Sequence, residues 1–137
     1  MARTVYYFDM DGVIANFHKE PYKYTNAINR EWIANLEPFV ENIKVIANLI
    51  EMGERVYILT KAASENAKLG KMDFIAKYLP MFNIEKYFIC IVGNGKKVDY
   101  IKEDGILVDD DMKNIRPWAK ANHKFIFVEE KGARVTI

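Results

Sequence analysis

The sequence predicts a doubly wound α/β fold built on a mostly parallel sheet. Five short apolar runs, rich in β-branched and aromatic residues, alternate with stretches of helical spacing along the 137-residue chain. The runs are too continuously apolar for a sheet with one face in water, which favours a sheet covered by helices on both faces. The predicted strands are "TVYYF" (4–8), "RVYILT" (55–60), "YFICIV" (87–92), "GILV" (105–108) and "KFIFV" (124–128).

Helices are predicted between the strands from apolar spacing and from residues that end helices. The first should stop at Gly53, a residue type that commonly follows a helix. The second should start after Ser64 as its N-cap and end before Pro80. The third, "MKNIRPWAKA", should be capped by Asp111, alone or shared with Asp110. The apolar positions are Phe39, Ile43, Ile46 and Ile50 in the first helix, and Met72, Ile75, Ala76 and Leu79 in the second.

The segment outside the alternation and the overall composition indicate the domain organisation and the cellular compartment. Residues 16–36 fall outside the alternation and should form one or two short helices over an edge of the sheet. No linker or repeat divides the chain, so one domain over residues 1–137 is expected. Lys plus Arg (20) nearly cancel Asp plus Glu (19), so the charge does not support a nucleic-acid partner or an anionic membrane surface. A single cysteine, Cys90, and no apolar run of membrane-spanning length favour a cytoplasmic protein without a membrane anchor.

Polar side chains gather where the predicted strands end. Asp9 and Asp11 end the first strand, Thr60 and Lys61 the second, and residues 109–111, all aspartates, the fourth. Ligands of open parallel sheets bind at these carboxyl ends. Five carboxylates at one rim would repel one another unless a cation neutralised them, and hard oxygen ligands suit Mg²⁺. A hydroxyl and an ammonium on a neighbouring strand could bind phosphate oxygens, so the pattern predicts a site for a phosphoryl group.

Four elements in order, "FDMDGV", "ILT", a lysine and "ILVDDD", resemble the motifs of the haloacid dehalogenase-like (HAD) phosphohydrolases. The stretches "LEPFVENIKVIANLIEMGERVYILT" and "GILVDDDMKNIRPWAKANHKFIFV" are similar to the 5'(3')-deoxyribonucleotidase-like branch. The resemblance spans residues 5–128. It implies a three-layer Rossmann-like fold, a five-stranded parallel sheet of order 5-4-1-2-3, and a very short cap, residues 16–36, inserted after the first strand.

The resemblance also implies Mg²⁺-dependent hydrolysis of a phosphomonoester. Asp9 would attack phosphorus to form an aspartyl-phosphate and would ligate Mg²⁺. Asp11 would protonate the leaving alkoxide and then activate water, with its backbone carbonyl on the metal. The lysine is either Lys96 or Lys97, and "KVDYI" leading into the fourth strand favours Lys97. Thr60, Lys61 and Lys97 would bind the phosphate, Asp109 would ligate the metal, and Asp110 would hold a metal-bound water or the lysine.

Several substrate classes stay open. A nucleotide is favoured, with Tyr22, Tyr24 or Trp32 of the cap stacking on a base, although aromatic residues in so short a segment more often pack onto their own domain. An open rim would instead suit sugar phosphates, a polynucleotide end or a phosphoprotein. A phospho-accepting receiver domain shares these residue types, but its acid pair lies on the first strand and its lysine on the last, unlike the order here. The sequence is compatible with an oligomer and sets no oligomeric state.

Overall fold

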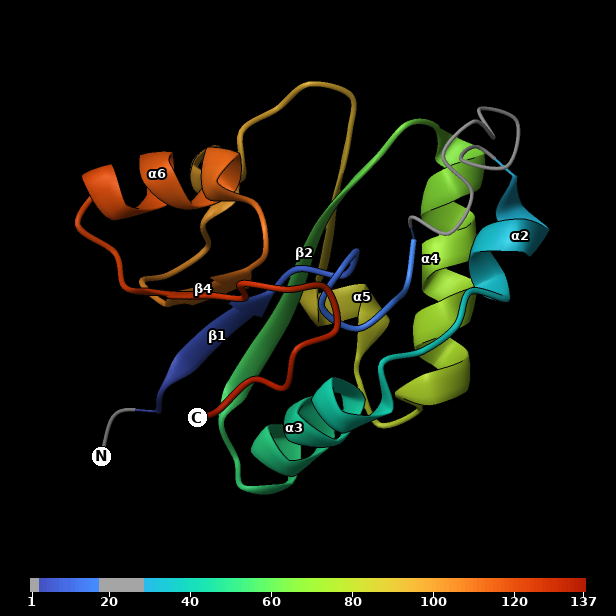
Figure 1. The fold of residues 1–137 in the computed structure, drawn as a ribbon, viewed down its shortest axis with the longest axis horizontal. Helices are drawn as coiled ribbons and strands as arrows, with labels where there is room; N and C mark the ends of the chain where they lie inside the picture. Colours follow the sequence, from blue (N-terminus) through green and yellow to red (C-terminus); the bar gives the residue numbers. More distant parts are fainter. Residues whose placement is uncertain (1–2, 18–28) are drawn as a thin grey trace.

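The structure is a computed structural model that describes residues 3–17 and 29–137. Its centre is a five-stranded, all-parallel sheet of order β3-β2-β1-β4-β5 (Figure 1). The sheet confirms the α/β fold and the strand order that were expected from the sequence. The strands are β1 (Val5–Phe8), β2 (Arg55–Ala62), β3 (Phe88–Val92), β4 (Ile106–Asp109) and β5 (Phe125–Phe127).

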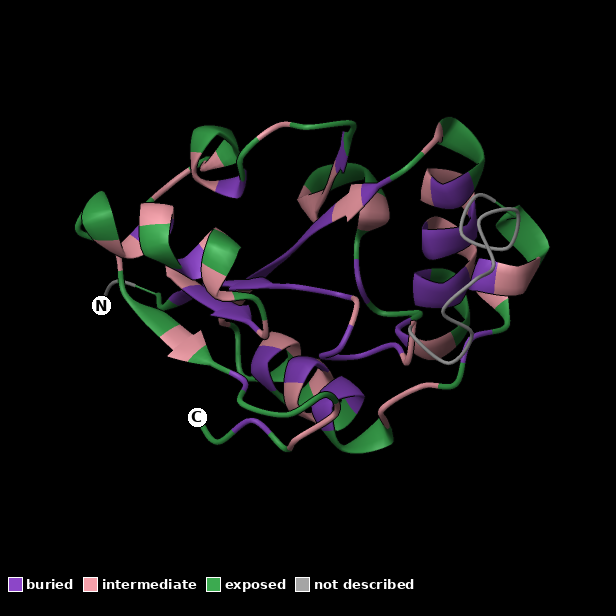
Figure 2. Ribbon diagram, turned by 45° about the horizontal axis from the view of Figure 1, so that its top comes forward, coloured by how far each residue is buried: buried purple, intermediate pink, exposed green. Residues whose placement is uncertain are grey.

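Helices cover both faces of the sheet, which gives three layers. Helices α3 and α4 pack on one face over the larger apolar cluster, and α6 with the short 3-10 helix η1 packs on the other. Strands β1, β2 and β4 are largely buried, whereas the edge strands β3 and β5 and the outward sides of the helices are more exposed (Figure 2). The helical elements are α2 (Arg30–Ala34), α3 (Val40–Glu51), α4 (Glu65–Tyr78), α5 (Ile84–Tyr87), η1 (Lys97–Tyr100) and α6 (Met112–Lys120).

The helices begin and end where the sequence signals predict. The Ser64 hydroxyl accepts a hydrogen bond from Ala67 N at 3.1 Å at the start of α4. The Asp111 carboxylate accepts from Lys113 N at 2.9 Å at the start of α6, so Asp111 is the N-cap residue. Gly53, with φ of +87°, follows α3 in a conformation that glycine adopts without strain.

The buried face of α4 differs from the predicted one. Ile75 and Leu79 are buried as expected, but Met72 and Ala76 are not, and the face turned to the core includes Gly70 and Lys71 instead. Gly70 lies here because α2 packs closely on α4. A Cβ at Gly70 would lie 2.5 Å from the Arg30 carbonyl oxygen. The position of Lys71 has a polar cause that apolar spacing cannot reveal, because its ammonium bonds to groups at the ends of the strands.

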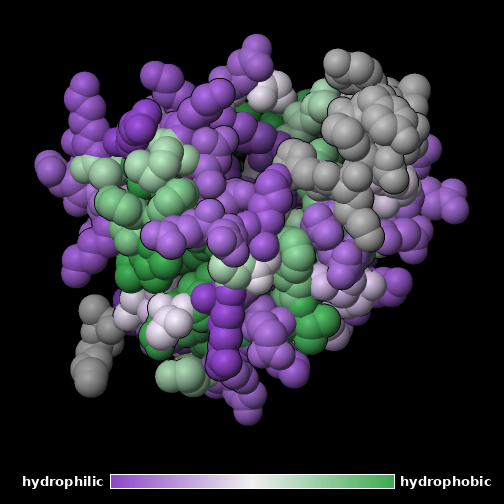
Figure 3. All heavy atoms as spheres, viewed as in Figure 1, coloured by the Kyte–Doolittle hydropathy of each residue, from purple (hydrophilic) through white to green (hydrophobic). Residues whose placement is uncertain are grey.

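Only part of the segment 16–36 can be compared with the prediction. Within it, the structure describes α2, which packs on α4 (Figure 1), while Tyr22 and Tyr24 lie outside the described residues. Trp32 of α2 makes an edge contact with Phe17, with ring centroids 5.7 Å apart. Hydrophilic side chains dominate the face drawn in Figure 3. Within residues 3–17 and 29–137, no helix is both long and apolar enough to cross a membrane.

Candidate active site

The loop after β1 places two carboxylates at the carboxyl end of the sheet. Asp9 continues the strand pairing, because its backbone N–H donates to Val108 O at 2.8 Å. The chain then turns tightly around the Met10 carbonyl, which accepts hydrogen bonds from three following amides. Gly12 adopts φ of +83°, and a Cβ there would overlap the Asp110 carboxylate. Glycine is therefore required at this turn both by the backbone conformation and by the approach of Asp110.

Three carboxylates and one lysine form the centre of the site. The Asp9, Asp109 and Asp110 side chains each offer an oxygen, and these oxygens all lie within 4.8 Å of one another. Lys97 of η1 bridges two of them, with Nζ at 2.8 Å from Asp9 Oδ1 and 2.8 Å from Asp109 Oδ2. The Lys97 side chain is only 1% exposed, and Asp109 is fully buried. Lys96 is exposed, so Lys97 is the lysine that the fold brings to the acids.

The remaining contacts of Asp109 hold its carboxylate in place. Its Oδ1 accepts from Asp111 N at 2.9 Å. Its Oδ2 accepts from the Asn114 side-chain amide at 3.2 Å in addition to Lys97. Both oxygens of this buried carboxylate are therefore hydrogen-bonded, as a buried charge requires.

The site holds more negative than positive charge in a buried setting. Burial raises the pKa of Asp9 above its ordinary value; Lys97 opposes this shift, and Asp109 and Asp11 add to it. Burial and the neighbouring Asp9 raise the pKa of Asp110 to about 6. Burial alone would lower the pKa of Lys97, but its two carboxylate partners raise it above the ordinary lysine value. An added cation would offset the repulsion among these acids.

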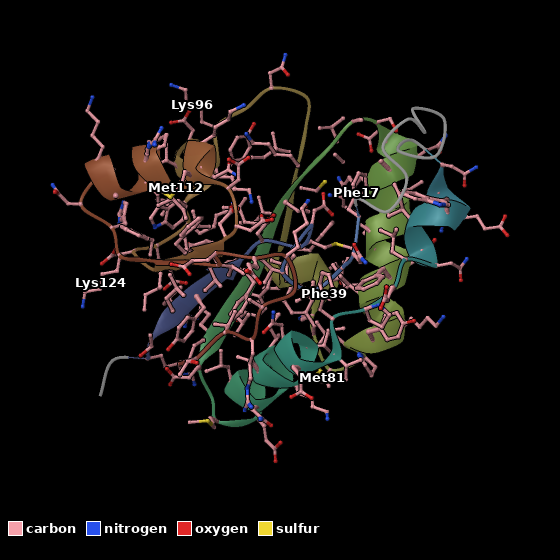
Figure 4. All side chains as sticks on the ribbon, in the orientation of Figure 1. Phe17, Phe39, Met81, Lys96, Met112 and Lys124 are labelled. Atoms are coloured by element: carbon pink, nitrogen blue, oxygen red, sulfur yellow. The ribbon has the colours of Figure 1, made fainter. Side chains whose placement is uncertain are left out.

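A cavity of about 390 Å³ opens onto these groups. Its lining includes most of the predicted site residues, although Thr60 and Asp109 are not among them because both are fully buried. Figure 4 labels Met112 on α6, Lys96 close to that helix and Phe17 close to α4. The cavity is lined by Asp9, Asp11, Lys61, Lys97, Asp110, Asp111, Asn114 and Lys131.

Asp11 and Thr60 are joined by a lysine that was not predicted. The Asp11 carboxylate lies outside the three-acid group and pairs with Lys71 of α4, whose Nζ is 2.9 Å from Asp11 Oδ2. The same Nζ donates to Thr60 Oγ1 at 2.7 Å. Lys61 lines the cavity, while its carbonyl oxygen accepts a third bond from Lys71 at 2.6 Å.

Asn114 and Lys131 were also missed. Asn114 donates to Asp109 from the first turn of α6. Its place in the sequence, a polar residue five positions after the acid that ends a strand, could have indicated this contact. Lys131 belongs to a C-terminal segment that returns to the β1 loop, where Gly132 N donates to Gly12 O at 2.8 Å. No local sequence signal marks this contact, because its two residues are far apart in the chain.

Comparison with known proteins identifies the fold. No protein-family model matches the chain. No curated protein matches it in sequence. Among solved structures, a chain of the Pnkp1/Rnl/Hen1 complex is similar, with a TM-score of 0.68 and 14% sequence identity over 93% of this chain and 47% of that chain. The shared feature is the three-layer α/β fold, and this chain spans less than half of that neighbour.

Proposed function

We propose that the chain is a HAD-like phosphomonoester hydrolase in which Asp9 is the nucleophile. The observation that carries this proposal is the placement of Asp9. Its carboxylate opens onto a cavity at the carboxyl end of β1 and is held by Lys97 beside two further acids. The order of the four motifs in the sequence supports the same chemistry. The likeness in fold is compatible with it.

The reaction follows from the chemistry of two side chains. An Asp9 oxygen attacks phosphorus, the bond from phosphorus to the ester oxygen breaks, and Asp11 gives that departing oxygen a proton. Asp11 then accepts a proton from water as the water oxygen attacks phosphorus. The bond between Asp9 and phosphorus breaks in this second step, and inorganic phosphate and free Asp9 are restored. Lys97 offsets negative charge next to the transferred group throughout.

The acids suit a divalent cation. Three carboxylate oxygens within 4.8 Å of one another, two of them from buried residues, are hard ligands whose charge a cation would balance. We assign Asp9 and Asp109 as side-chain ligands, with the Asp11 carbonyl as the backbone ligand implied by the family resemblance, and Mg²⁺ as the ion. Asp110, which the sequence placed beside a metal-bound water or the lysine, offers an oxygen as close as the other two, and we propose it as a third side-chain ligand instead. When bound, Mg²⁺ would reduce the repulsion between the attacking carboxylate and the phosphate.

The proposed substrate is a small phosphorylated molecule, with a nucleotide preferred. The sequence likeness to deoxyribonucleotidase-like proteins supports this preference. Of the three aromatic residues considered for base stacking, Trp32 is the one described, and its ring lies against Phe17 beside α4. Phosphate binding is assigned to Lys61 and Lys97, which line the cavity, and to the buried hydroxyl of Thr60.

Phosphate release from a panel of phosphomonoesters with Mg²⁺ tests the proposal. The panel includes deoxynucleoside monophosphates, sugar phosphates and p-nitrophenyl phosphate, each compared between the wild-type protein and Asp9→Asn. Turnover by the wild type and none by the variant is expected. Equal phosphate release by both proteins would remove Asp9 as the nucleophile, and no release by the wild type from any substrate would refute the hydrolase assignment.

A further inference from the structure

Lys71 is a buried lysine that lies outside the four motifs. It sits on the core-facing side of α4, between Ala67 and Ile75, with a side chain that is 1% exposed. An apolar residue would fill such a position without the cost of taking an ammonium out of water. A lysine in this position therefore calls for an explanation in terms of what its ammonium contacts.

The three contacts of the ammonium use all three of its N–H donors. They run to Asp11 Oδ2, Thr60 Oγ1 and the Lys61 carbonyl oxygen, at 2.9, 2.7 and 2.6 Å. The acceptors belong to the β1 loop and to the end of β2. Lys71 thus ties α4 to two of the segments that carry proposed site residues.

These bonds fix the orientation of two polar groups. An ammonium can only donate, so Thr60 Oγ1 must accept, and the Thr60 hydroxyl proton is left free to donate to another group. Asp11 Oδ2 is likewise engaged as an acceptor. Asp11 Oδ1, in contrast, is buried and has no hydrogen-bond partner among the described residues.

We propose that Lys71 is a positioning residue that orients the Asp11 carboxylate for proton transfer. This inference rests on the proposed hydrolase function and adds a residue from α4 to it. Lys71 acts through Asp11, which lines the cavity, and does not touch the reacting atoms. If Lys71 only stabilised the fold, its substitution would lower kcat/KM by the same factor for every substrate. If it orients Asp11, the loss should be larger for substrates whose leaving group needs a proton.

The test compares leaving groups in Lys71→Met, which keeps an unbranched side chain one atom shorter than that of lysine and removes the charge. The kcat/KM value covers the steps through departure of the leaving group. Proton delivery matters for an alkoxide and little for p-nitrophenolate, because the latter leaves as a stable anion. Losing well-placed general acid catalysis costs ~10²–10⁴-fold, so we expect kcat/KM for a deoxynucleoside monophosphate to fall by roughly 10²-fold and that for p-nitrophenyl phosphate by less than about 10-fold.

Two controls separate positioning from stability. Ile75→Val removes one methyl group from the same buried face of α4 and should lower kcat/KM for both substrates by the same small factor. In an Asp11→Asn background, adding Lys71→Met should no longer discriminate between the two leaving groups, because the group that it orients has lost its proton-transfer role. If Lys71→Met fails to fold, Lys71→Gln retains hydrogen-bond donors and carries the same comparison.

The outcomes distinguish this inference from the proposed function. Wild-type protein that releases no phosphate, or that Asp9→Asn leaves unchanged, would overturn the hydrolase proposal and this inference together. An active, Asp9-dependent wild type in which Lys71→Met lowers both kcat/KM values by one common factor would overturn only the positioning role. A loss concentrated on the alkoxide leaving group, and absent in the Asp11→Asn background, is the result that supports it.

Discussion

The Cα of Gly12 faces the Asp110 carboxylate so closely that a Cβ at residue 12 would overlap it. The two residues lie almost a hundred positions apart, one after β1 and the other after β4, and parallel pairing of these strands brings them together. The absence of a side chain at residue 12 thus allows an acid from β4 to approach the loop that carries Asp9 and Asp11. A side chain at residue 12 would therefore displace Asp110 from the site.

Gly12→Ala should therefore lower the free energy of unfolding more than a glycine-to-alanine substitution at a position that has a similar positive φ but open space around it. Gly53, with φ of +87° and open space within 4 Å of the point where a Cβ would lie, is the matched control. A left-handed residue costs ~1–2 kcal/mol, and we expect Gly53→Ala to show this cost alone. Denaturant unfolding of both variants, in the wild-type and Asp110→Ala backgrounds, measures the difference. An excess loss for Gly12→Ala that Asp110→Ala does not relieve would contradict the steric explanation.

A divalent cation should stabilise the native state if the acids form its site. An ion that binds only the folded protein adds ~2.7 kcal/mol at a concentration 100-fold above its Kd. Calorimetry with Mg²⁺ and with EDTA should give a higher Tm with the ion, and Asp110→Asn should reduce this rise. Asp104→Asn, which removes an exposed carboxylate paired with His123, should leave the rise unchanged. The same rise in Asp110→Asn as in the wild type would exclude Asp110 from the ligands.

The fold was largely predictable because its signals are local. Apolar runs with β-branched residues mark the strands, and Ser64, Asp111 and Gly53 mark helix ends. Once the strands are known to be parallel, their carboxyl ends must share one edge, and this rule alone brings Asp9 near Asp109.

The parts of the site that were missed depend on contacts between distant segments. Lys71 occupies a buried helical position that a lysine seldom takes, and its partners are known only when α4 is placed beside the ends of the strands. The sequence does hold a trace of it, since a lysine interrupts the apolar face formed by Ala67, Phe74 and Ile75. Lys131 leaves no such trace, because a returning C-terminal segment carries it to the cavity.

A polar cluster on η1's side of the sheet, away from the proposed site, should make stability depend on pH. Glu103 accepts hydrogen bonds from Arg55 at 2.7 Å and from the Tyr57 hydroxyl at 2.7 Å. The Arg55 bond, followed by that of Tyr57, lowers the pKa of Glu103. A lowered carboxyl pKa contributes stability above the unfolded value of roughly 4.3, and this stability is lost as the pH falls through the lower folded value.

Glu103→Gln should thus lower Tm at pH 7, and the difference from the wild type should shrink as the pH falls below roughly 4. Thermal unfolding across this range measures the effect. Glu41→Gln is the control, because Glu41 is exposed and its oxygen lies 3.7 Å from Lys44 in a surface pair of little expected worth. A Tm difference for Glu103→Gln that stays constant from pH 7 to pH 3 would show that lost packing, and not the charge, is responsible.

The two proposed steps make different demands on Asp11, so Asp11→Asn should separate them. With p-nitrophenyl phosphate the first step needs little proton donation, because p-nitrophenolate leaves readily. The second step needs a base to activate water, and losing such a base costs ~10²–10⁴-fold. The phosphorylated form of the protein should therefore accumulate, and p-nitrophenol should appear in an initial burst of about one equivalent, as expected for a covalent intermediate.

Mass spectrometry after acid quenching should find one added phosphoryl group on the peptide that contains Asp9. Asp9→Asn should give neither the burst nor the added group, and their absence from Asp11→Asn, in a protein that still binds the substrate, would argue for direct attack by water without an aspartyl-phosphate.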